Sequence, residues 1–146
     1  MKKLISVLLI LVVLSLTSCR EEQNAYEILT EFVSLYGAEG IIYSPEIPEG
    51  QGGYLPDGLV ERIFLFTDGI GENFAILLNT HIDSPVECGV FVCSDDAEML
   101  QCEEVCLERL RVLGSEGGFV KRRGRVVYYA LMPEPEKAER IFKQII

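Results

Sequence analysis

The stretch Val86-Glu87-Cys88-Gly89-Val90-Phe91-Val92-Cys93 runs directly into Ser94-Asp95-Asp96. Residues 86–93 are a short apolar run bounded by turn-forming residues, which is typical of a buried β-strand. The polar residues that follow have side chains that cap helices. Apolar residues then recur every three or four positions as far as Leu113, and Gly114 ends the pattern. The sequence therefore predicts a strand that leads into a long helix over residues 96–113.

Shorter elements surround this pair. Strands are expected at 74–82, 118–121 and 125–132, and helices at 26–36, 56–66 and 133–146. Residues 37–57 are rich in Gly and Pro, which predicts a long irregular loop. This order of elements predicts an α+β domain, in which a small antiparallel or mixed sheet of about four strands has helices packed on one face.

The N-terminus has the residue order of a secretory signal. Met1-Lys2-Lys3 precedes an apolar run that is shorter than the ~20 residues a membrane-spanning helix needs. Leu16-Thr17-Ser18-Cys19 then follows, and it resembles the lipobox of bacterial lipoproteins. The resemblance implies cleavage before Cys19 and a diacylglyceryl group on its thiol.

These features predict a signal peptide at 1–18, a lipidated Cys19 with a polar tether over 19–25, and one globular domain over 26–146. The mature protein is expected to be extracytoplasmic and lipid-anchored to the cell membrane. Without residues 1–18, 11 basic residues stand against 23 acidic ones, which gives a net charge of −12. Such a surface repels phosphate backbones, so we expect no nucleic acid as a partner.

The second half of the chain carries three further motifs. They are a strand with Glu before apolar residues (87–92), an Asp-started helix that ends in a Leu–Arg stretch (95–109), and the hairpin segment Arg123-Gly124-Arg125-Val126-Val127-Tyr128. Together with the lipobox, they resemble a family of small bacterial lipoproteins that contain a domain of unknown function. The resemblance implies the α+β fold and carries over no catalytic residue.

Four cysteines follow Cys19: Cys88, Cys93, Cys102 and Cys106. The first two are an odd number of positions apart, so they lie on opposite faces of a strand. The last two share the apolar face of the long helix. Burial as small apolar side chains is our first interpretation. One disulfide between strand and helix is the second. A metal site comes third, because the strand pair is loosely spaced for zinc and the helix pair lies in an apolar stripe.

Two sets of side chains are candidate binding residues. The first lies in or near the Gly/Pro-rich loop and consists of Tyr36, Tyr43 and Tyr54. Tyrosine offers an apolar ring with a polar tip, although the loop can equally be a mobile wrap over the sheet. The second is a basic cluster in an acidic chain and consists of Lys121, Arg122 and Arg123. It either docks an acidic partner or lipid head group, or protects the edge of a hairpin.

No set of catalytic residues stands out in the sequence. His81 is the sole histidine, and nothing near it supplies the other groups that a general base needs. We therefore expect a non-enzymatic module that binds another envelope protein without a cofactor. The alternative is an extracytoplasmic small-ligand binder with a pocket under residues 37–54. A hydrolase that uses Asp or Glu is a third hypothesis.

Overall fold

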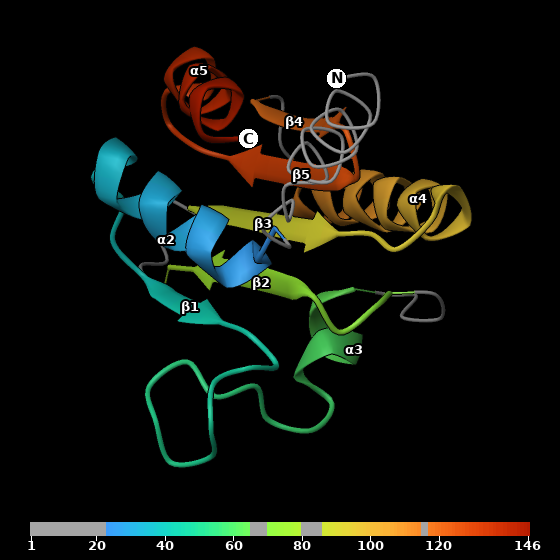
Figure 1. The fold of residues 1–146 in the computed structure, drawn as a ribbon. Helices are drawn as coiled ribbons and strands as arrows, with labels where there is room; N and C mark the ends of the chain where they lie inside the picture. Colours follow the sequence, from blue (N-terminus) through green and yellow to red (C-terminus); the bar gives the residue numbers. More distant parts are fainter. Residues whose placement is uncertain (1–22, 65–69, 80–85, 115–116) are drawn as a thin grey trace, which may run out of the picture.

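The computed structural model describes residues 23–64, 70–79, 86–114 and 117–146 (Figure 1). The strand and helix predicted at its centre are confirmed: β3 spans Glu87–Val92 and α4 spans Asp96–Leu113. Asp95 caps the helix, since its carboxylate accepts a hydrogen bond of 2.8 Å from the backbone N–H of Glu98. Gly114 ends the helix in the left-handed region, with φ of 64°. Local signals at both ends thus fix the bounds of α4.

The sheet has five strands, all paired antiparallel, in the order β1-β2-β3-β5-β4. The strands besides β3 are β1 (Ile41–Tyr43), β2 (Phe74–Leu78), β4 (Gly118–Arg123) and β5 (Val126–Leu131). The predicted α+β class is confirmed. Of the two kinds of sheet that the prediction left open, antiparallel and mixed, the structure has the antiparallel one. The additional strand is β1, which lies inside the segment expected to be irregular and pairs with β2 at one edge.

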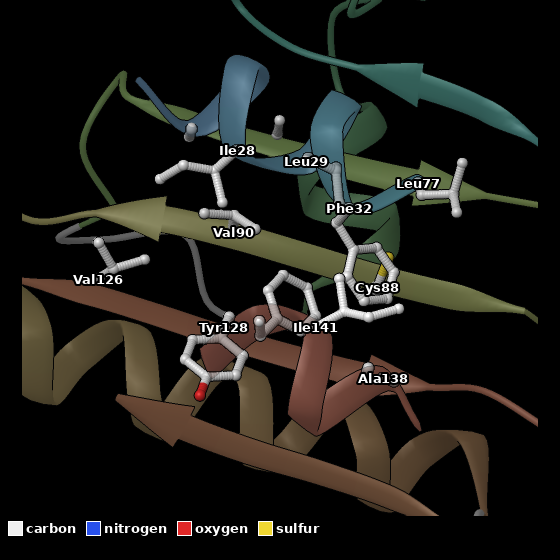
Figure 2. Close-up of a cluster of buried hydrophobic side chains, with 14 of the residues drawn as sticks. Ile28, Leu29, Phe32, Leu77, Cys88, Val90, Val126, Tyr128, Ala138 and Ile141 are labelled. Atoms are coloured by element: carbon white, nitrogen blue, oxygen red, sulfur yellow. The ribbon is translucent and has the colours of Figure 1, made fainter. Parts of the chain in front are cut away.

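The helices cover both faces of the sheet, so the expectation that they pack on one face is wrong. α2 (Ala25–Tyr36) and α5 (Pro135–Ile145) pack on one face, against alternate residues such as Leu77, Val90 and Tyr128 (Figure 2). α3 (Leu59–Ile63) and α4 pack on the other, against Phe91 and Tyr129. The physical reason is that all six residues of β5 are buried, which requires a cover on each face.

Three helix starts differ from the prediction, and the last helix, α5, begins at Pro135 and not at Pro133. α2 begins at Ala25, inside the predicted tether, because Asn24 caps it by accepting a hydrogen bond from the N–H of Glu27 at 3.1 Å. α3 begins at Leu59 and not at Pro56, because Gly58 precedes it with φ of 74°. Residues 65–66 and 80–82, expected to end one helix and one strand, lie outside the described residues. Within the described ranges, no helix is both long enough and apolar enough to cross a membrane.

The pairing of Gly89 in β3 with Tyr129 in β5 predicts that a side chain at position 89 destabilises the fold. A Cβ atom at position 89 would lie 2.4 Å from Cε1 of Tyr129, whose ring is fully buried. We expect Gly89→Ala to lower the free energy of unfolding by about 1–3 kcal/mol, as overpacking does. Urea denaturation measures this. Gly52→Ala is the control, since nothing lies within 4 Å of its added Cβ. Equal stability of the two variants would contradict the packing.

Candidate functional site

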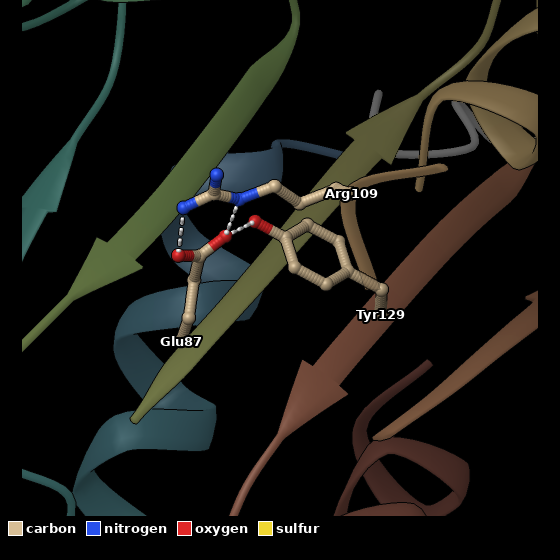
Figure 3. Close-up of polar contacts among 3 residues, drawn as sticks. All are labelled: Glu87, Arg109 and Tyr129. Carbon is tan, nitrogen blue, oxygen red and sulfur yellow. Dashed lines mark hydrogen bonds and ion pairs between the residues drawn. The ribbon is translucent and has the colours of Figure 1, made fainter. Parts of the chain in front are cut away.

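A buried polar cluster joins the sheet to α4 (Figure 3). Glu87 Oε1 accepts hydrogen bonds from Arg109 Nε at 2.7 Å and from the hydroxyl of Tyr129 at 2.6 Å. Glu87 Oε2 accepts a third from Arg109 Nη2 at 2.7 Å. The side chains of Arg109 and Glu87 are 16% and 7% exposed. We call these three residues the clamp.

The electrostatics of the clamp are those of a structural ion pair. Hydrogen bonding to Glu87 raises the pKa of Arg109, which keeps the guanidinium charged. Burial, with Glu87 beside it, raises the pKa of Tyr129 well above its usual value, so the phenol stays protonated and donates. Both oxygens of Glu87 are already occupied by these donors. The clamp therefore fixes α4 on the sheet.

A cleft of about 1200 Å³ lies at the opposite end of β3. We call it the sheet-end cleft. Its walls come from the start of β2, the end of β3, the first turn of α4 and the turn between β4 and β5. Its lining residues are Gln23, Gly71, Glu72, Asn73, Val92, Cys93, Ser94, Glu98, Gly124 and Arg125.

Two side chains hold the walls of this cleft together. Glu98 Oε1 accepts from the N–H of Gly71 at 2.8 Å, and Glu98 Oε2 accepts from the N–H and the hydroxyl of Ser94 at 2.7 and 2.6 Å. Asn73 donates to the carbonyl of Gln23 at 3.0 Å and accepts from the N–H of Ala25 at 2.9 Å. The chain therefore enters the domain at the edge of the cleft.

The four cysteines after Cys19 are free and buried in the structure. Cys88 packs on the α2/α5 face, whereas Cys93, Cys102 and Cys106 pack on the α3/α4 face. The predicted opposite orientation of the two strand cysteines is thus confirmed. Burial raises the pKa of Cys88 and of Cys106. A hydrogen bond from Cys102 lowers the pKa of Cys93, the cysteine that lines the cleft.

The three candidate tyrosines lie on three different segments of the chain. The hydroxyl of Tyr36 accepts from the N–H of Glu134 at 3.1 Å, and Lys137 Nζ lies 4.5 Å from its ring centroid, so Tyr36 joins α2 to α5. Tyr43 lies in β1, and Tyr54 forms a bridge with Ser44.

A groove of about 390 Å³ does lie between the loop and α2. Its lining residues are Asn24, Tyr26, Glu27, Glu46, Ile47, Pro48, Gln51 and Gly52, which do not include the three tyrosines.

The basic cluster is divided between the two faces of the edge strand β4. Arg122 lies 3.7 Å from Glu103 of α4, as an exposed ion pair. Arg123 donates to the carbonyl of Lys143 near the end of α5. Lys121 is exposed. Two of the three side chains therefore have partners within the chain, on α4 and on α5.

Cys19 and His81 lie outside the described residues. The sequence interpretation missed both the clamp and the role of Glu98. One signal was available for the clamp, since a Glu inside a buried apolar strand needs a partner. Comparisons with protein-family models, with curated proteins and with solved structures find no match to this chain. The resemblance to small lipoproteins therefore stays a prediction.

The clamp predicts that two arginines of α4 differ greatly in how much they contribute to the stability of the fold. Arg109→Met leaves the buried carboxylate of Glu87 without its counter-ion, so we expect a loss of about 3–5 kcal/mol in the free energy of unfolding. Arg111→Met is the matched control, because Arg111 pairs with Glu108 but is 74% exposed, and its loss of stability should be much smaller than that of Arg109→Met. Chemical denaturation of both variants measures the difference. Similar losses would contradict a structural role for the clamp.

The cleft predicts an order of cysteine reactivity. We expect iodoacetamide to modify Cys93 before Cys88, Cys102 and Cys106, because Cys93 lines the cleft and its thiolate is favoured. Peptide mass spectrometry after short exposures of the folded protein gives the order. Reaction in denaturant should abolish the order, and a preference for Cys88 in the folded protein would refute it.

Proposed function

We propose that this chain is an extracytoplasmic, lipid-anchored, non-enzymatic module that binds another envelope protein in the sheet-end cleft. The observation that carries the proposal is the position of Gln23. It lines the cleft, Asn73 holds its carbonyl, and it stands four residues after the predicted lipidation site Cys19.

The length of chain between Cys19 and Gln23 limits how far the cleft can lie from the lipid anchor. Four residues span at most about 14 Å when fully extended. A diacylglyceryl group on Cys19 would therefore keep Gln23, and the edge of the cleft with it, within that distance of the anchor. A partner at the membrane surface would meet this end of the domain first.

The size and lining of the cleft suit a polypeptide segment. Pockets for small molecules usually have volumes of about 300–1,000 Å³, and this cleft is slightly larger, at about 1200 Å³. Its lining combines the apolar Val92 and Cys93 with the charged Glu72, Glu98 and Arg125. Such a mixture is typical of surfaces that bind other proteins.

The groove between the loop and α2 supports the alternative function, a small-ligand binder. Its volume of about 390 Å³ falls within the range of small-molecule pockets. It lies beside the Gly/Pro-rich loop, where a pocket was expected. Ile47 and Pro48 give it an apolar wall, and Glu46 is held there by Asn24 at 2.9 Å.

Site-specific photo-crosslinking in intact cells tests the proposal. A photoreactive residue at position 72 should capture one defined envelope protein. The same residue at position 104, an exposed Glu outside the cleft, should not. Cys19→Ser should abolish the incorporation of labelled palmitate into the protein.

The outcomes separate the alternatives. Identical adducts from positions 72 and 104 would refute binding in the cleft. If a photoreactive residue at position 51 captures a small molecule, and position 72 captures nothing, the result would favour small-ligand binding in the groove between the loop and α2. Absence of labelled palmitate from the unaltered protein would refute the anchor.

A further inference from the structure

We propose that Cys93, Cys102 and Glu98 form a binding site for a thiophilic divalent cation of the zinc class, open to the sheet-end cleft. The Sγ atoms of the two cysteines and a carboxylate oxygen of Glu98 all lie within 4.8 Å of one another. Around a tetrahedral zinc ion, bonds of about 2.3 Å to sulfur and about 2.0 Å to oxygen place neighbouring ligands about 3.5–3.8 Å apart. Shifts of ~1 Å by these side chains are enough to close the site.

The three ligands come from elements whose positions are fixed by other contacts. Cys93 follows β3, and its backbone N–H donates to the carbonyl of Arg125 at 2.8 Å. Glu98 and Cys102 are four residues apart on α4, so they share one face of the helix. The hydrogen bonds from Ser94 and Gly71 hold the carboxylate of Glu98 in place, as outer partners do at metal sites.

The burial of the ligands gives an enclosed floor and an open approach. Cys102 is fully buried and Cys93 is 3% exposed, whereas Glu98 is half-buried. Cys93 and Glu98 both line the cleft, so an ion can enter from it. Three protein ligands leave a fourth position for water or for a group from a bound molecule.

The surroundings of the site carry charges of both signs. Two thiolates and one carboxylate carry one negative charge more than a divalent ion neutralises. Arg125 lines the same cleft close to Cys93 and opposes that excess, whereas Asp95 near Cys93 and Glu72 in the cleft lining add to it. On binding, the two thiols give up their protons to solvent and their sulfur lone pairs bond the ion, with no change of oxidation state.

The two cysteines of the site, Cys93 and Cys102, belong to different pairs in the sequence. Cys88 and Cys93 lie on opposite faces of the sheet, and Cys93, which directly follows β3, lies on the same face as Cys102 and Cys106. The site takes one thiol from each pair, and a carboxylate, Glu98, that was not among the candidate residues of the sequence. This inference stands apart from the proposed protein partner, because the ion is held by this chain alone.

Titration with Co²⁺ tests the site. The full chain is purified from membranes in detergent and kept reduced with a phosphine. We expect one ion per chain, with thiolate-to-cobalt charge-transfer absorption that Zn²⁺ removes by displacement. Cys93→Ser and Cys102→Ser should abolish that absorption, and Glu98→Gln should weaken binding about tenfold or more. Cys88→Ser, on the other face of the sheet, is the matched control and should bind normally.

A second measurement needs no variant. Zn²⁺ should protect Cys93 and Cys102 of the unaltered protein from alkylation, while Cys88 is unaffected. The proposal is overturned if no charge-transfer band forms, or if Cys93→Ser binds as the unaltered chain does. It is also overturned if the protein taken from cells, with thiols blocked at lysis, carries a disulfide between Cys93 and Cys102, since no thiolate would then remain for an ion.

Discussion

The ion pair between Glu87 and Arg109 is the contact on which the arrangement of the α3/α4 face depends. Burial of the Glu87 carboxylate to 7% exposure has a large desolvation cost. Two charge-assisted hydrogen bonds from Arg109 and one from the hydroxyl of Tyr129 offset that cost. The hydroxyl reaches Glu87 because the ring of Tyr129 lies over Gly89, where no side chain intervenes. A glycine on β3, a tyrosine on β5 and an arginine on α4 are thus required by one buried charge.

The same contact sets the register of α4 against β3. From Glu87 to Cys93 the strand advances about 20 Å, at about 3.4 Å per residue. From Arg109 back to Glu98 the helix covers about 16 Å, at about 1.5 Å per residue. The two elements run in opposite directions, so fixing Arg109 at one end brings Glu98 and Cys102 beside Cys93 at the other. The clamp thus holds one end of α4, while the short connection over residues 93–95 and the bonds of Glu98 to Ser94 and Gly71 hold the end at the sheet-end cleft.

Much of the fold could be predicted from local sequence, and the failures share a physical cause. α4 was predicted with its observed bounds because Asp95 and Gly114 terminate it through contacts within the helix. β1 was missed because three residues give too short a pattern, and its partner β2 begins 31 residues later in the chain. The cover on both faces was missed although the unbroken apolar run of β5 indicates it.

The site residues were harder to predict, because their partners are distant in sequence. Glu87 meets Arg109 across 22 residues and Tyr129 across 42, and Glu98 meets Gly71 across 27. The two ends of α4 also differ in how far their contacts are exposed to solvent, which the spacing of residues in the sequence does not reveal. The clamp end is buried, whereas the cleft end is held by hydrogen bonds at half-exposed positions such as Gly71 and Glu98. Hydrogen bonds open to solvent break at lower free energy than buried ones. The end of the helix that can adapt to a ligand is consequently the end that the cleft exposes, while the opposite end keeps the helix in register.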